Sequence, residues 1–317
     1  MKSYYNSKKL IDRVRTKGSI PVSDQLFKDT DILEFANEEI DLGIVPTVLQ
    51  LHEDYFLHSQ AVPLESNKQK YSIPYRAIGN KLRDVQFRDT NGQHYEMKRI
   101  PVDYLPDYRG IYTTSRPEFF YVENNHINIV KGSSELVGDL VFSYYMRPNQ
   151  LVMPDKVGII TSVDYDNNRV TLDKLPSEFL PSLKFDIIQE RSPHRTISFD
   201  MEVTSIINIP QVFVTFEEDL PAGIMAGDQV ALTEQSSIPQ IPSELHNFLA
   251  QRVHARLMEA MGDTEGLQTA NAKIAELENK SHTIIDNRIE GSPQKIVSRN
   301  SILSQTIRGG RRGFRRY

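Results

Sequence analysis

Three side chains with oxygen ligands, Asp164, Asp166 and Asn168, have the alternate spacing that begins a calcium-binding loop. Such loops also need a glycine at the sharp turn and a bidentate glutamate at the end. Arg169 stands in place of the glycine, and Leu175 occupies the position of the glutamate. We therefore expect a β-turn built on Asp and Asn here, not a calcium site.

Other groups suited to acid–base or metal chemistry lack partners at the required spacing. The pair His52-Glu53 needs a second histidine four residues on, but His58 is six residues away, so a polar helix surface is expected. Residues 217–219, Glu-Glu-Asp, offer carboxylates with no partner that the sequence can place, which is typical of a solvated turn. His246 and His254 share a helix face, where satisfied or surface histidines are expected.

The composition narrows the chemistry further. The chain has no cysteine, so disulfides and thiolate metal sites are excluded. It has no GxxxxGK or GxGxxG loop to cradle phosphate and no GxSxG nucleophile elbow. We expect no catalytic residue, cofactor or metal, and no enzyme; glycan hydrolysis in the β region is an alternative that requires two facing carboxylates. Apolar runs such as Val157–Ile160 are too short to span a membrane, and we expect synthesis in the cytoplasm.

Charge is distributed unevenly along the chain. Residues 288–317 contain eight basic side chains and one acid, whereas the other residues contain 29 basic and 41 acidic side chains. The tail therefore carries a net charge of +7 and the rest −12. Its end, RGGRRGFRRY, is similar to segments that bind single-stranded nucleic acid, and its guanidinium groups suit an acidic protein surface equally well.

Helical periodicity occurs at both ends of the chain. Residues 1–22 are expected to form a basic arm. Residues 27–40 follow a helical period, with a cap at Asp29 or Thr30 and a stop at Gly43, and a second helix is expected from Pro46 to about His58. A Ser243 cap begins a third helical stripe, which continues past an interruption at residues 262–263 to about residue 286. Because no period follows, residues 288–317 should be disordered when alone.

The region between the helices alternates short β-rich runs with turn signals. Asn91-Gly92 predicts one hairpin, residues 123–126 predict another, and residues 138–148 read as a strand. Residues 160–193 and 203–239 contain the same motifs in the same order: Thr-Ser, then apolar-Thr-apolar, then Leu-Pro, then Asp. We interpret this as an internal repeat whose two halves close a small barrel or sandwich, with chance similarity as the alternative.

Together these patterns predict an α+β fold with five parts. A basic N-terminal arm, 1–22, precedes a helical bundle built from two helix hairpins, 23–70 and 241–287. An antiparallel β-barrel or sandwich, 71–240, is inserted between the hairpins, and an extended tail, 288–317, follows.

Four stretches, in this order along the chain, resemble the head–tail adaptor family of short-tailed phages (podoviruses). They are FKDTDILEFANEEIDLGIVPTVLQLHEDYF at 27–56, YSIPYRAIGNKLRDV at 71–85, IPQIPSELHNFLAQRVHARLMEAMGDTEGL at 238–267 and RIEGSPQKIVSRN at 288–300. The long β insertion departs from the smallest adaptors, so the resemblance does not say what the β region contacts.

The resemblance implies a structural protein in the neck of the virion, assembled in the host cytoplasm. Such adaptors form a ring with copies of themselves, usually twelve, under the portal protein and above the tail nozzle proteins. Genomic DNA passes through the ring lumen without specific binding, and no membrane is involved. The alternative is another virion component, or a nucleic-acid-binding protein that acts through its tail.

The resemblance also implies that the C-terminal extension runs up along the portal. The portal-docking tail expected on this basis comprises Arg288, Arg299, Arg308, Arg311, Arg312, Phe314, Arg315, Arg316 and Tyr317.

Overall fold

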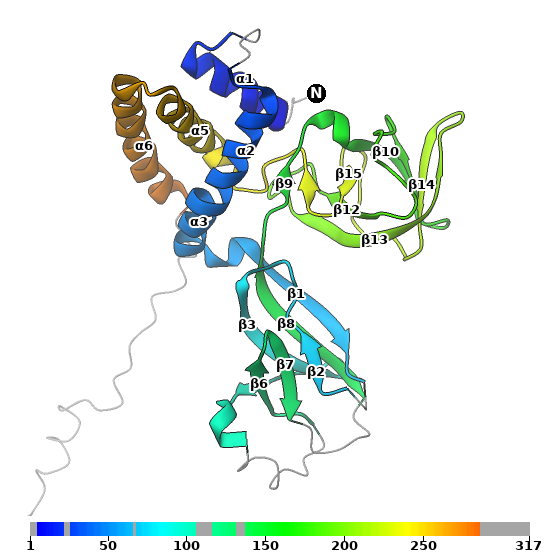
Figure 1. The fold of residues 1–317 in the computed structure, drawn as a ribbon. Coiled ribbons are helices and arrows are strands. Elements are labelled where there is room, and N and C mark those ends of the chain that lie inside the picture. Colours follow the sequence, from blue (N-terminus) through cyan, green and yellow to red (C-terminus); the bar gives the residue numbers. More distant parts are fainter. Residues whose placement is uncertain (1–4, 22–25, 66–67, 106–115, 131–136, 286–317) are drawn as a thin grey trace, which may run out of the picture. The chain divides into compact units, whose positions relative to one another are not determined.

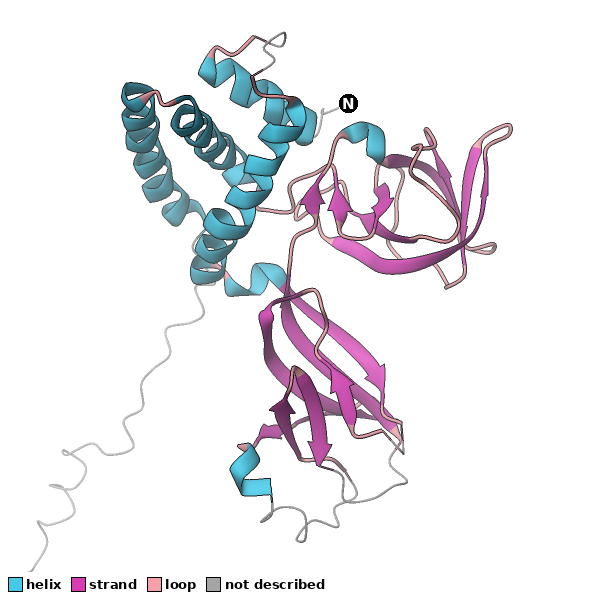
Figure 2. Cartoon of the chain, in the orientation of Figure 1, coloured by secondary structure: helices cyan, strands magenta, loops and turns pink. Residues whose placement is uncertain are grey.

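A computed structural model describes residues 5–21, 26–65, 68–105, 116–130 and 137–285 (Figure 1). It divides the chain into a unit of Met1–Asp286 and a unit of Asn287–Tyr317. The second unit, and with it the expected portal-docking tail, lies outside the described residues. The first unit has an α+β fold in which the helices and the strands occupy separate parts of the chain (Figure 2).

The helices come from the two ends of the first unit. They are α1 (Ser7–Gly18), α2 (Asp29–Glu39), the π-helical turn η1 (Ile40–Ile44), α3 (Val45–Leu51), α5 (His246–Met261) and α6 (Thr264–Ile285). Apolar side chains from the first four and from α5 form one buried core, and Leu267, Ile274 and Leu277 of α6 pack against it. Helical spacing puts these side chains on one face of each helix, which is why segments more than 200 residues apart in sequence share a core.

Two expectations for the N-terminal region differ from the structure. Residues 1–22 are not only a basic arm, because Leu10, Ile11 and Val14 of α1 are fully buried in the helical core. Gly43 does not stop a helix either. The chain continues through η1 into α3, which ends at Leu51 and not at His58.

Pro46 lies in the first turn of α3, as the sequence predicted. Proline is tolerated there because its missing N–H has no partner in the first turn of a helix. A Cβ at Gly43 would lie 2.6 Å from the guanidinium of Arg252, which is the end of a flexible side chain and would have to shift.

The first β module is a pair of sheets. One sheet has the order β1-β8-β3-β4 and the other the order β2-β7-β6-β5. Their strands are β1 (Leu57–Pro63), β2 (Lys70–Ser72), β3 (Ala77–Asp89), β4 (His94–Glu96), β5 (Lys98–Arg99), β6 (Phe119–Glu123), β7 (His126–Val130) and β8 (Gly138–Met146). Both sheets contribute to one core that includes Val85, Phe142, Phe120 and Ile127, so the module is a sandwich. The hairpins expected at Asn91-Gly92 and at residues 123–126 are confirmed.

The second β module is a closed barrel with its own core. Its strand order is β10-β11-β14-β13-β12-β15. The strands are β10 (Gly158–Asp164), β11 (Arg169–Leu172), β12 (Lys184–Ile188), β13 (Thr196–Ile207), β14 (Val212–Phe216) and β15 (Gln229–Leu232). A short parallel pair, β9 (Gln150–Leu151) and β16 (Gln235–Ser236), flanks it in sequence. The expected barrel is confirmed, but the β region holds two separate cores where one inserted domain was expected.

The two halves of the barrel have matching strand pairing. In the first, Ile160 faces Leu172 and Ser162 faces Thr171, with an irregularity between Ile160 and Ser162. In the second, Val203 faces Phe216 and Ser205 faces Thr215, with the irregularity at the same place. The hydroxyls of Thr161 and Thr204, at these irregularities, donate to the carbonyls of Thr171 and Thr215 over 3.2 and 3.1 Å. The repeated Thr-Ser motif therefore marks an equivalent position in the two hairpins.

Candidate functional site

The turn with calcium-like spacing is stabilised by its own side chains. The Asp164 carboxylate accepts a hydrogen bond from the Asn167 side chain over 2.8 Å and pairs with Arg169 over 2.8 Å. These interactions lower the pKa of Asp164, with the Asn167 bond as the larger cause. Among the described residues, no group of three His, Asp or Glu side chains is placed to hold a metal ion.

The other candidate side chains do not converge. The three acids at 217–219 are exposed at the end of β14. His52 stacks edge-on against Tyr55, whereas His58 lies in β1 between the rings of Tyr144 and Phe199. Burial lowers the pKa of His58.

His246 is buried and stacks against two rings. Its ring lies 4.4 Å from that of Tyr5 and 5.8 Å from that of His194. Burial, and after it the charge of His194, lowers the pKa of His246 to about 4. His254 does not join this stack, although it shares the helix. The sequence placed both histidines on one face, but it held no signal for Tyr5 or His194 as partners.

The strongest concentration of buried charge is centred on Arg76, in the turn between β2 and β3. Its guanidinium forms a bidentate pair with Asp186 of β12, with bonds of 2.8 and 2.9 Å, and a third bond of 2.9 Å to Asp200 of β13. Its Nε donates to the hydroxyl of Tyr75 over 3.0 Å. Only 2% of the Arg76 side chain and none of the Asp186 side chain is exposed.

The remaining acceptor positions of Asp186 are also filled. The Asn149 amide donates to this carboxylate over 2.7 Å, and the backbone N–H groups of Asp200 and Glu234 donate over 3.1 and 3.0 Å. Burial alone would disfavour the charge on Arg76, but the bonds and charge of Asp186 outweigh it and raise the pKa of Arg76. The carboxylate of Asp186 has no exposure to solvent, and the cluster links the turn of the sandwich to strands β12 and β13 of the barrel.

A second charge cluster joins the helices. The buried Glu39 carboxylate of α2 pairs with Arg256 over 2.6 Å and with Arg252 over 2.5 Å, both on α5. The sequence pointed to Asp186 only as the Asp of the repeated pattern, and it predicted neither charge cluster, because each pairing spans more than 100 residues and leaves no local motif.

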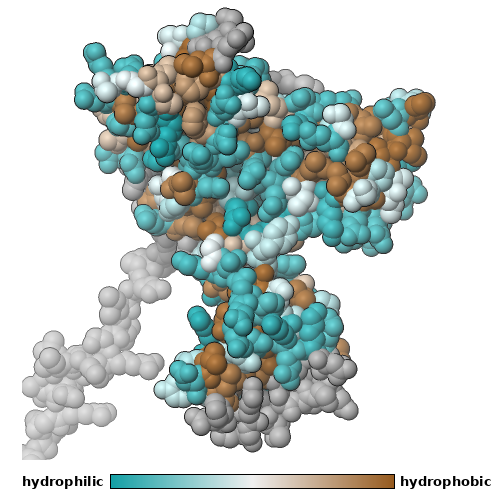
Figure 3. All heavy atoms as spheres, viewed as in Figure 1, coloured by the Kyte–Doolittle hydropathy of each residue, from teal (hydrophilic) through white to brown (hydrophobic). Residues whose placement is uncertain are grey.

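The barrel also exposes apolar side chains in its loops. Ile209, in the hairpin between β13 and β14, is 84% exposed, and Met225, Leu180 and Tyr165 in other barrel loops are about half exposed. Hydrophobic atoms are visible on this part of the surface (Figure 3). Each of these residues stands in a different loop of the barrel, and single exposed apolar residues are common on protein surfaces.

The comparisons with known proteins give no relative. No protein-family model matches the chain, and no curated protein matches it. No helix in the described ranges has both the length and the apolar character needed to cross a membrane.

Proposed function

We propose that this chain is a structural head–tail adaptor of a phage virion, which forms a ring under the portal and connects head to tail. In this proposal the helices from both ends of the chain form one bundle, the β modules are carried as an insertion, and the tail at 288–317 docks on the portal. DNA passes through the ring during ejection and is not bound specifically.

The observation that carries the proposal is the packing of the resembling stretches. The stretches at 27–56 and 238–267, which are far apart in sequence, contribute to one core. The buried Glu39 of the first pairs with Arg252 and Arg256 of the second. An adaptor body assembled from both ends of a chain requires this kind of contact.

Charge and surface character also support a ring subunit. A ring needs two different and complementary flanks on each subunit. The acidic body and the basic tail provide opposite charges, and the apolar barrel loops provide contact area. An acidic lumen would let DNA pass without adhering to it.

Truncation after Asn287 tests the tail. The truncated and full-length proteins are mixed with the portal protein of the same virus, and ring attachment is counted in electron micrographs. We expect the truncated protein to fold, because the described cores end before residue 287, and to fail to attach. Single exposed ion pairs contribute only about 0.2–1 kcal/mol, so attachment depends on many copies acting together.

A salt-dependent DNA-binding measurement separates the nucleic-acid alternative. If the tail holds DNA, truncation lowers DNA affinity and flattens its dependence on salt. Full attachment of the truncated protein to the portal would refute the docking role, and the absence of any ring on the portal with full-length protein would refute the adaptor proposal itself.

A further inference from the structure

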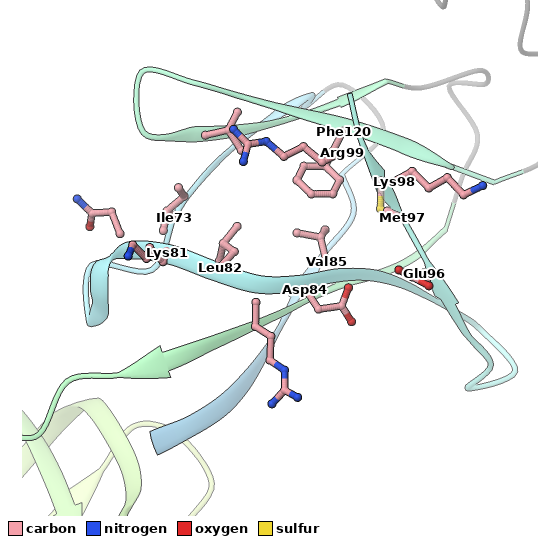
Figure 4. Close-up of a pocket in the computed structure, with 13 residues that line it drawn as sticks. Ile73, Lys81, Leu82, Asp84, Val85, Glu96, Met97, Lys98, Arg99 and Phe120 are labelled. Carbon is pink, nitrogen blue, oxygen red and sulfur yellow. The ribbon is translucent and has the colours of Figure 1, made fainter. Parts of the chain in front are cut away.

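The sandwich contains a groove of about 640 Å³ between β3 on one side and β5 and β6 on the other. Its floor is apolar and is formed by Ile73, Leu82, Val85, Met97, Phe120 and Val122. The side chains of Ile73, Leu82, Val85 and Phe120 face the same space (Figure 4). An apolar floor of this kind favours burial of an apolar partner.

The groove runs along the edge of the strands. All the residues from 80 to 85 line it, as do all those from 96 to 99. Successive side chains of a strand point to opposite faces of its sheet. The pairing of β3 with β8 is irregular between Ala77 and Leu82 and between Leu82 and Asp84, which also brings consecutive residues of β3 to the groove. The groove thus reaches the backbone of β3 on the side away from β8.

The edge is open because the chain changes sheets. β4 pairs with β3 at residues 86–88, and the last bond runs from the Met97 N–H to the Val85 carbonyl over 3.0 Å. Lys98 and Arg99 then join β6 in the other sheet. Among the described residues, no strand takes the place beside residues 80–84 on the side that β4 leaves.

The rim of the groove is basic, although residues 1–287 together carry a net charge of −12. Lys81, Lys98 and Arg99 are exposed, and no ion pair to them occurs in the described part of the chain. Arg83 pairs with Asp54, so its charge is already matched. Lys81 and Lys98 lie toward opposite ends of the groove (Figure 4). Two acids, Asp84 and Glu96, also line the groove, which leaves the cations in excess.

We propose that this groove is a docking site for an extended acidic segment of a partner protein, which adds a strand along β3. Its backbone would pair with residues 81–84, which follow the left-handed Asn80, its alternate apolar side chains would enter the floor, and its carboxylates would meet the basic rim. The basic tail at 288–317 has the wrong charge for this groove. The inference goes beyond the adaptor proposal and does not depend on ring formation.

Binding of a fluorescein-labelled heptapeptide, DVEIEVD, to the full-length protein tests the proposal. Fluorescence anisotropy measures its affinity at low and high salt. We expect binding that weakens at high salt and at least tenfold weaker binding to the double variant Lys98→Glu, Arg99→Glu. The variant Lys70→Glu is the matched control, because Lys70 is equally exposed on β2, the opposite edge strand of the same sheet. It should bind the peptide as the wild type does.

Two further probes keep the outcome decisive. The same peptide with N-methylated backbone should lose affinity, because strand pairing needs its N–H groups. If the double variant loses its circular dichroism spectrum, Lys81→Glu alone provides the test.

Equal binding of the basic peptide KVKIKVK, unchanged binding to the rim variants, or no binding of DVEIEVD would overturn the proposal. So would self-association of the wild-type protein that the rim variants abolish, since a second copy would then occupy the groove.

Discussion

Replacing Arg76 with methionine should destabilise the protein more than any surface ion-pair deletion. The change removes two bonds to Asp186 and one each to Asp200, Tyr75 and Asn149, and it leaves the Asp186 carboxylate buried without its cation. Removing one partner of a buried ion pair costs about 3–5 kcal/mol. Asp186 keeps three donors, the Asn149 amide and two backbone N–H groups, so the loss should lie at the lower end, about 3 kcal/mol.

A double-mutant cycle with Asp186→Asn isolates the interaction. The double variant should be more stable than the sum of the two single losses predicts, because neither charge is then left buried alone. The chain has 14 tyrosines and no tryptophan, so urea unfolding is followed by tyrosine fluorescence and circular dichroism. Hydrogen exchange in β12 and β13 then reports whether the barrel is the part that loosens.

The matched control is Arg88→Met. Arg88 pairs with Asp139 in the sandwich, but about a third of each side chain is exposed, so the loss should stay below about 1 kcal/mol. An Arg76→Met loss no larger than that of Arg88→Met would refute the reasoning.

Two further predictions concern the histidine stack and the barrel repeat. Because the pKa of His246 is lowered to about 4 in the folded protein, the unfolded chain binds a proton first as pH falls below about 6.5. The contribution of His246 to the free energy of unfolding is therefore complete above pH 6.5 and falls by up to about 3 kcal/mol toward pH 4. The variant His246→Phe, which keeps the ring stack, should reduce this loss in thermal melts. An unchanged pH profile would contradict the prediction. Thr161→Val and Thr204→Val should cost similar amounts, about 0.5–1 kcal/mol each, because each hydroxyl makes the same bond in its half; unequal costs in urea unfolding would argue against equivalent positions.

Local patterns were sufficient for much of the fold. The apolar stripe that follows Ser243 predicted a helix, and α5 buries most of it: Leu249, Val253 and Leu257 are in the core, whereas Met261 is 38% exposed. The turn at Asn91-Gly92 predicted a hairpin, because both residue types accept turn geometry, and Gly92 has a φ of +80°. These features depend on neighbours within a few residues, so a single sequence contains the whole signal.

Contacts between residues far apart in sequence could not be predicted from the sequence. Arg76 stands in a stretch with no chemical motif, and its partner Asp186 is 110 residues away. Gly43 has the residue type of a helix stop, but the chain continues through it as part of η1. The sequence showed that both halves of the repeat contain this Asp, but it did not indicate what the side chains contact. Asp186 pairs with Arg76, whereas Asp228 accepts hydrogen bonds from the backbone N–H groups of Glu190 and Met225.

The matching halves of the barrel bear on how such a module can arise. In the pairing of β11 with β14, Val170 faces Val214, and these two residues occupy equivalent places in the two halves. The two halves therefore contact each other through equivalent strand edges. Exchanging the halves leaves the cyclic order of the strands unchanged. Two identical three-stranded units could close this barrel as a homodimer. Duplication and fusion of one ancestral unit, followed by divergence such as that of Asp186 and Asp228, would yield the present chain. The barrel would have been closed at each stage, first as a homodimer and then as a single chain.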